Sequence, residues 1–113
     1  MGKLKLINCS DRIFVAGHNG MVGRAVCRQL IKKGYKNLIT SDRSNLDLEI
    51  YTEVESFLSV HKPAVVVLCA AKVGGILANK NYPADFILKN LMIQTNLIKS
   101  SWNIGVKRFL FLG

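Results

Sequence analysis

Apolar residues along this chain alternate between short compact runs and longer stretches with helical spacing. The compact runs are rich in Val, Ile, Leu and Phe, and they predict four β-strands at residues 12–16, 37–41, 64–71 and 107–112. The third run, AVVVLCAA, is apolar on both faces. That pattern is typical of a central parallel strand that helices cover on both sides.

Three helices are expected between these strands. Val22, Val26 and Leu30 recur at helical spacing, and Gly34 then supplies a natural C-terminal stop. The three predicted helices span residues 22–33, 51–61 and 83–103. Since Pro83 suits a first helical turn and Gly105 suits a stop, the last helix is the longest.

The order strand-helix-strand, repeated with short connections, predicts a parallel α/β sheet with right-handed crossovers. We expect a doubly wound fold of the Rossmann type, in which the four strands form the first half of the sheet in the order 3-2-1-4. No repeat or linker divides the chain, so residues 1–113 are expected to form one domain after a basic lead over residues 1–11.

The stretch VAGHNGMVG lies between the first predicted strand and the first predicted helix. Gly17 permits a sharp turn, Gly20 permits close approach of a pyrophosphate, and Gly23 permits the helix to pack close to the sheet. Amides at the helix start then point at the anion. The residues expected to bind an NAD(P) cofactor here are Gly17, His18, Asn19, Gly20, Met21, Val22 and Gly23.

Two charged residues, Asp42 and Arg43, follow the second strand, where the adenosine ribose of a dinucleotide should lie. A carboxylate there favours NAD, whereas a guanidinium pairs with the 2′-phosphate of NADP. Arg43 and the positive net charge favour NADP, although both residues also fit ordinary surface positions. Ala70 and Ala71, at the carboxyl end of the third strand, leave room for the adenosine side of the cofactor.

Composition limits the classes of ligand and the cellular location that are expected for this chain. The 113 residues carry a net charge of +9, but the cations are scattered, so we expect a phosphorylated small molecule rather than nucleic acid. The three cysteines form no C-x-x-C pair, and His18 and His61 assemble no metal site. Without a signal peptide or a long apolar run, the chain is expected to be cytoplasmic and not membrane-bound.

Three stretches, GHNGMVG, AAKVGGILAN and NYPADFILKN, together resemble the GDP-L-fucose synthases of the extended short-chain dehydrogenase/reductase group. The resemblance covers residues 12–113. It implies an NADP(H) cofactor and a nucleotide-sugar substrate that is epimerised and reduced. It also implies that Arg43 meets the 2′-phosphate, that Asp42 is less typical at its position, and that the helix from Pro83 packs in a homodimer.

The resemblance further implies a catalytic serine, cysteine and histidine and a Tyr-x-x-x-Lys pair after the run FLG. Residues Tyr35, Tyr51 and Tyr82 have no lysine four positions on, so no catalytic residue is assigned in this chain. We expect an amino-terminal part of such an enzyme that is inactive alone. Another NAD(P)-dependent nucleotide-sugar epimerase or dehydratase, or a non-catalytic nucleotide-binding module, remains an alternative.

Overall fold

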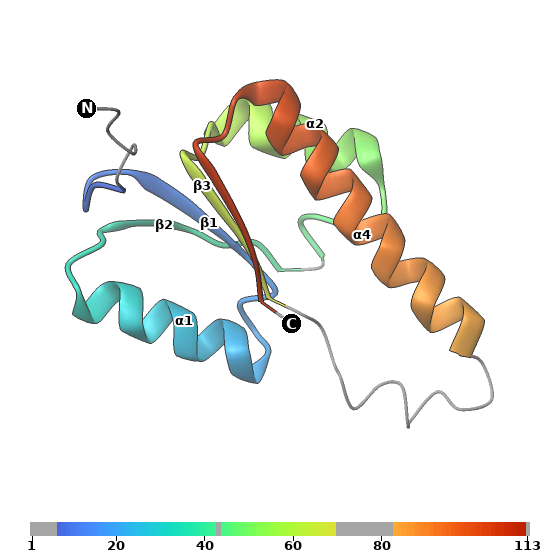
Figure 1. Ribbon diagram of the computed structural model, residues 1–113, viewed down its shortest axis with the longest axis horizontal. Coiled ribbons are helices and arrows are strands. Elements are labelled where there is room, and N and C mark those ends of the chain that lie inside the picture. The colour runs from blue at the N-terminus through green and yellow to red at the C-terminus, as the bar shows by residue number, and fades with distance from the viewer. Residues whose placement is uncertain (1–6, 43, 70–82, 113) are drawn as a thin grey trace, which may run out of the picture.

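The four predicted strands form one parallel sheet, with helices on both faces (Figure 1). The computed structural model describes residues 7–42, 44–69 and 83–112, with side chains from residue 87 onward in the last segment. The strands are β1 (Arg12–Ala16), β2 (Asn37–Ile39), β3 (Val65–Cys69) and β4 (Arg108–Leu112). The helices are α1 (Met21–Lys32), α2 (Tyr51–His61) and α4 (Pro83–Ile104).

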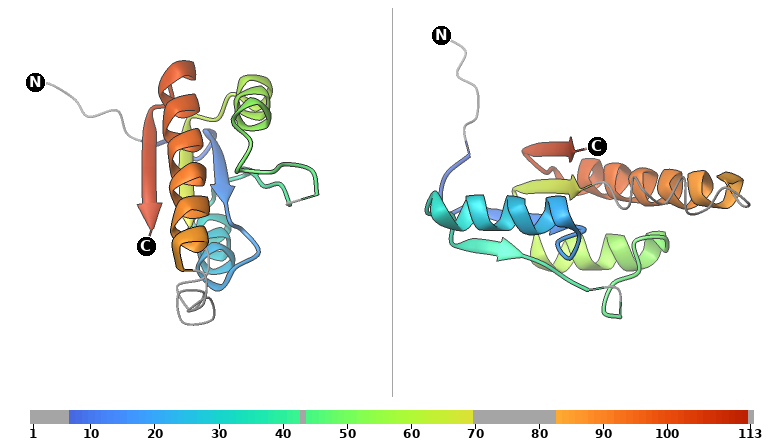
Figure 2. Two further views of the ribbon diagram at one scale, coloured as in Figure 1. Left: turned by 90° about the vertical axis from the view of Figure 1, so that its right-hand side faces the viewer. Right: turned by 90° about the horizontal axis from the view of Figure 1, so that it is seen from below.

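The predicted strand order, 3-2-1-4, is wrong: the sheet runs β2-β1-β3-β4. In the right-hand view of Figure 2, which looks onto the sheet, β2 and β4 lie at the two edges. Register confirms that β1 pairs with β2 through Ile13 and Leu38, and with β3 through Ile13 and Val65. The third strand therefore lies on the other side of β1 and not beyond β2.

The two faces of the sheet explain this order. Val26 and Leu30 of α1 pack against one face, while Val54 and Leu58 of α2 pack against the opposite face. Because parallel crossovers are right-handed, a helix on the opposite face carries the chain in the opposite direction across the sheet. The order 3-2-1-4 would have required α2 to share the face of α1.

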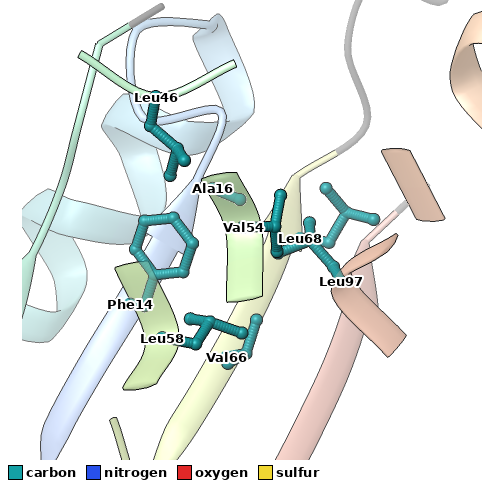
Figure 3. Packing of buried hydrophobic residues seen from close by; sticks show 8 residues of the cluster. All are labelled: Phe14, Ala16, Leu46, Val54, Leu58, Val66, Leu68 and Leu97. Carbon is teal, nitrogen blue, oxygen red and sulfur yellow. The ribbon is translucent and has the colours of Figure 1, made fainter. Parts of the chain in front are cut away.

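Alternation along β1 and β3 produces two hydrophobic clusters. Phe14, Ala16, Val66 and Leu68 point toward α2 and α4, as Figure 3 shows around Phe14. Their neighbours in sequence point toward α1: Ile13, Val15, Val65, Val67 and Cys69. All five residues of β3 are buried, which confirms the prediction of a central strand covered on both sides.

Glycine ends both α1 and α4 in the same way. Gly105 adopts φ +76° and donates its amide to the Trp102 carbonyl at 3.2 Å, while the next amide, from Val106, reaches the Ser101 carbonyl at 3.0 Å. These two bonds satisfy carbonyls that the last helical turn leaves without partners. Gly34 closes α1 with φ +93° and an equivalent pair of bonds.

The sheet reverses its winding between β1 and β3. From β1 the chain crosses to β2, and from β3 it crosses in the other direction to β4. In open parallel sheets a ligand binds in the crevice that such a reversal opens beyond the carboxyl ends of the strands. The loop after β1, which carries the glycine motif, lies at this point. Among the described residues no helix has the length and hydrophobicity needed to cross a membrane.

Candidate dinucleotide-binding site

The glycine loop turns sharply off β1 and lies against the end of β3. Gly17 adopts φ +84°, and its carbonyl accepts the Gly20 amide at 3.2 Å. A Cβ at Gly17 would lie 2.9 Å from the Cys69 carbonyl oxygen. Glycine is therefore required here twice, first by a left-handed backbone and second by contact with the neighbouring strand.

At Gly23 the nearest neighbours belong to the loop that leaves β1. A Cβ at Gly23 would lie 2.0 Å from the Gly17 carbonyl oxygen and 2.7 Å from the Cα of His18. These are backbone atoms of the loop itself. Gly23 therefore lets the first turn of α1 pack on its own preceding loop, and through that loop it approaches the sheet.

The first turn of α1 presents free amides to the crevice side. Gly20 is the N-cap, in an extended conformation, and it makes no side-chain capping bond. The first intrahelical bond runs from the Arg24 amide to the Gly20 carbonyl at 2.9 Å. The amides of Met21, Val22 and Gly23 consequently have no acceptor inside the helix. No acidic residue stands in this turn, so the positive end of the helix dipole is available to an anion.

Neither the backbone conformation nor the packing at Gly20 requires glycine. Its backbone, at φ −75° and ψ 170°, is one that any residue adopts, and a Cβ would meet only the Gly17 carbonyl oxygen at 3.6 Å. This is an ordinary van der Waals distance. Local packing therefore gives no reason for glycine at position 20, whereas close approach of a pyrophosphate to the backbone does.

Asp42, beyond β2, organises the turn that follows. One oxygen of its carboxylate, Oδ1, accepts hydrogen bonds from the Ser44 hydroxyl at 2.7 Å and the Asn45 amide at 3.2 Å. Its backbone carbonyl accepts the Leu46 amide at 3.0 Å, and Leu46 is buried in the core above Phe14 (Figure 3). Asp42 thus holds Ser44, Asn45 and Leu46 in a turn through these hydrogen bonds. Asp, Ser and Asn at this spacing favour such a turn, which was not among the predictions from the sequence.

The bond from the Ser44 hydroxyl, followed by the Asn45 amide, lowers the pKa of Asp42 below its ordinary value. The positive charge that His18 can carry contributes in the same direction. His18 lies in the loop after β1 and Asp42 in the loop after β2. Since β1 and β2 are paired and parallel, these two loops are expected to lie near each other. Asp42 is therefore ionised at neutral pH.

Three predicted cofactor-binding residues, Arg43, Ala70 and Ala71, lie outside the described residues. Of the rest, the structure brings Gly17, Gly20 and Gly23 into one compact loop. It leaves Met21 82% exposed at the start of α1, and His18 half-buried within the loop. Asn19 is exposed between them.

Of the three cysteines, Cys9 is exposed, Cys27 is half-buried and Cys69 is buried. Burial raises the pKa of both Cys27 and Cys69, and the charge of the Cys27 thiolate adds to the effect at Cys69. Both side chains pack in the cluster beneath α1. The described His, Cys, Asp and Glu residues form no group that could hold a metal ion. Sequence reasoning did not anticipate that the backbone carbonyl of Cys69 would contact the glycine loop.

A model of the NAD dependent epimerase/dehydratase family matches residues 13–113. Among curated proteins, the chain is 54% identical over 108 residues to a putative GDP-L-fucose synthase 2 from Arabidopsis thaliana, covering 96% of this chain and 33% of that relative. It is 46% identical over 103 residues to the GDP-L-fucose synthase of Escherichia coli, covering 91% of this chain and 32% of that one. The chain thus spans about a third of the length of the curated relatives it matches.

Several solved structures resemble this chain in both sequence and fold. A GDP-D-glycero-L-gluco-heptose synthase from Campylobacter jejuni, solved in the presence of NADPH, superposes with a TM-score of 0.89 at 39% identity, covering 96% of this chain and 32% of that one. A GDP-mannoheptose C4 reductase from the same organism, with NADP bound, gives 0.84 at 38% identity, covering 95% and 34%. The sheet, the glycine loop and the family match over almost the whole chain agree, and the chain belongs to the NAD dependent epimerase/dehydratase family.

Proposed function

We propose that this chain is the amino-terminal, cofactor-binding part of a GDP-L-fucose synthase, and that residues Gly17 to Gly23 bind the pyrophosphate of NADP(H). The observation that carries the proposal is the first turn of α1. Its amides at Met21, Val22 and Gly23 lack intrahelical acceptors, and the N-cap before them is a glycine that no protein contact requires. Identities of 46–56% to curated GDP-L-fucose synthases support the enzyme class.

The position of Asp42 supports NADP over NAD. A carboxylate that selects NAD hydrogen-bonds both ribose hydroxyls. In this chain Oδ1 of Asp42 already accepts two hydrogen bonds from Ser44 and Asn45, so this oxygen serves the turn rather than a ribose hydroxyl. The relatives solved with NADPH or NADP are consistent with this preference. Arg43, the neighbouring residue in sequence, is the proposed partner of the 2′-phosphate.

A fluorescence titration of the purified chain with NADPH and, in parallel, NADH tests the proposal, with circular dichroism to verify folding. Saturable binding that is tighter for NADPH is the expected result. Arg43→Ala should abolish the difference between the two cofactors and leave NADH binding unchanged. A folded chain that binds neither cofactor contradicts the proposal.

The variant Asp42→Asn separates the two roles of that residue. If the carboxylate serves the turn, the variant weakens NADPH and NADH binding by the same factor. If instead the carboxylate binds the ribose, the variant weakens NADH binding selectively. The second result would contradict the assignment of Asp42 to the turn.

The complete enzyme is proposed to epimerise and reduce a GDP-4-keto-6-deoxy-mannose substrate. Since the chain contains no Tyr-x-x-x-Lys pair, it is proposed to bind cofactor without catalysing this reduction. Steady oxidation of NADPH by the pure chain in the presence of that nucleotide-sugar would contradict this part of the proposal.

The outer face of α4 is proposed to pack against a second copy of the chain. Four large apolar side chains are more than half exposed along one side of the helix: Ile87, Leu91, Ile98 and Trp102. The opposite side of α4 packs against α2 and the segment before it, where the Asn96 side chain donates to the Leu48 carbonyl at 2.9 Å. Sedimentation equilibrium should detect a dimer that Trp102→Glu dissociates, and a monomeric chain at all concentrations would contradict the proposal.

A further inference from the structure

Three cations form a row along the outer face of α1. Arg24, Arg28 and Lys32 follow one another at intervals of four residues, and all three side chains are exposed. The helix contains no Asp or Glu, and none of the three cations forms a salt bridge with a described residue. We refer to these three residues as the α1 ridge.

The α1 ridge does not stabilise its own helix. Like charges four residues apart repel one another. Arg24 also stands near the positive end of the helix dipole, where a cation is unfavourable, and only Lys32 in the last turn is favourably placed. Local energetics therefore do not account for a row of cations at these positions.

No negative charge lies on α1 itself, although Asp42, in the loop after β2, is close enough to the glycine loop to interact with His18. Five of the seven acidic residues fall between residues 42 and 55. Two of them, Glu53 and Glu55, are on α2, which covers the face of the sheet opposite to α1 (Figure 1). The cations of α1 therefore have no acidic neighbour on their own helix, whereas α2 carries two carboxylates. With a rise of about 1.5 Å per residue, Lys32 lies only about 12 Å along the helix from Arg24, and Arg24 follows directly after the glycine loop.

We propose that the α1 ridge steers the anionic dinucleotide toward the glycine loop. The inference rests on the proposed function, because it presumes that the loop binds a phosphorylated cofactor. Charges around the entrance to a site raise the local concentration of an oppositely charged ligand, and they act on the association rate more than on the dissociation rate. Their effect falls when salt shortens the Debye length.

Stopped-flow fluorescence with NADPH tests this inference on the full chain. The variant R28E/K32E changes the two ridge residues farther from the loop. A matched control, K62E/K99E, makes the same exchange at exposed lysines at the end of α2 and on α4. Replacing one Lys or Arg by Glu lowers the net charge by two. Both double variants therefore lower the formal net charge from +9 to +5. Circular dichroism verifies that each variant is folded.

At low ionic strength R28E/K32E should slow association about three- to tenfold and change dissociation by less than about twofold. The control should slow association by less than half as much, and the difference should vanish in about 0.5 M salt. Equal slowing in both variants would overturn the inference, because net charge alone would then explain the effect. Faster dissociation in R28E/K32E would also overturn it, since the ridge would then contact the bound cofactor.

The two proposals fail in different ways. A folded wild-type chain without saturable NADPH binding overturns the proposed function, and this inference falls with it. Saturable binding together with an unchanged association rate in R28E/K32E overturns the steering inference alone.

Discussion

The glycine loop at the carboxyl edge of the sheet and the Gly105 turn at its amino edge both contain a glycine in the left-handed region, at φ +84° and +76°. Their surroundings differ. A Cβ at Gly17 would meet the Cys69 carbonyl oxygen at 2.9 Å, whereas a Cβ at Gly105 would meet nothing within 4 Å. One glycine is required by its conformation and its neighbours, and the other by conformation alone.

Gly20 and Gly23 extend this comparison. Gly23 has an ordinary helical position but is enclosed by loop backbone, with the Gly17 carbonyl oxygen 2.0 Å from the place of its Cβ. Gly20 is neither enclosed nor in the left-handed region. Glycine can thus be required for three different reasons at these four positions: close packing against backbone, a left-handed backbone conformation, or access for a ligand. Four alanine substitutions test that separation.

Gly23→Ala should have the largest effect. The new methyl group overlaps the backbone atoms of Gly17 and His18, which cannot move without displacing the loop. We expect a loss of about 3 kcal/mol or more in the free energy of unfolding, at the upper end of the cost of overpacking. Urea denaturation followed by circular dichroism measures it. A loss below about 1 kcal/mol would show that the loop does not enclose Gly23.

Gly17→Ala should be the next most damaging substitution. The left-handed backbone costs an alanine about 1–2 kcal/mol, and contact with the Cys69 carbonyl adds to this. We expect a total loss of about 2–3 kcal/mol in the same denaturation experiment. The loss should exceed that of Gly105→Ala, and equal losses would contradict contact between the loop and β3.

Gly20→Ala should act on binding and barely on folding. Alanine is a poorer N-cap than glycine, which costs about 0.5 kcal/mol of stability. The methyl group would stand where a pyrophosphate approaches, so NADPH affinity should fall by about tenfold or more. Fluorescence titration of the folded variant measures it. Unchanged affinity would remove the main reason for assigning the pyrophosphate to this loop.

Gly105→Ala should isolate the conformational cost alone. With no neighbour near the added methyl group, we expect a loss of about 1 kcal/mol from the left-handed backbone. NADPH affinity should not change, because this turn lies at the opposite edge of the sheet. A change in affinity in a folded variant would mean that the two edges are coupled.

The smallest effect concerns the ion pair at the amino edge, where the Lys107 ammonium lies 3.4 Å from Oδ1 of Asp11. A hydrogen bond from the Asn8 amide, and secondarily Lys107, lowers the pKa of Asp11 from its ordinary value of 3.8. The lowered pKa stabilises the fold above that value, and the contribution is lost as the pH falls through the pKa of the folded state. Asp11→Asn should therefore flatten the dependence of unfolding free energy on pH below about 4. An unchanged slope would contradict a lowered pKa at Asp11.

Much of the fold was predictable from local patterns. The strand predicted at residues 12–16 coincides with β1, and the buried run in 64–71 contains β3. The strand order was not predictable in the same way, because alternation and handedness leave the direction of each crossover open. That direction follows from the face on which Val54 and Leu58 of α2 pack, which is a tertiary contact.

In the candidate site, too, local patterns were predictable from the sequence, whereas tertiary contacts were not. The glycine spacing predicted the loop, and the structure places the three glycines together there. Sequence spacing did not reveal that the first turn of α1 packs on the backbone of Gly17 and His18 at Gly23. The turn that Asp42 holds depends on hydrogen bonds to Ser44 and Asn45, whose residue types favour it but do not establish its geometry.

The proposed pyrophosphate site consists of the amides at the start of α1. The most direct test is a ¹⁵N-edited NMR titration of the chain with NADPH, followed at the amides of Gly20, Met21, Val22 and Gly23. We predict large, saturable shifts at these four amides, with a dissociation constant equal to that from fluorescence. The Gly105 amide, at the opposite edge of the sheet, should not shift. Saturable NADPH binding that leaves the four loop amides unperturbed would contradict the account.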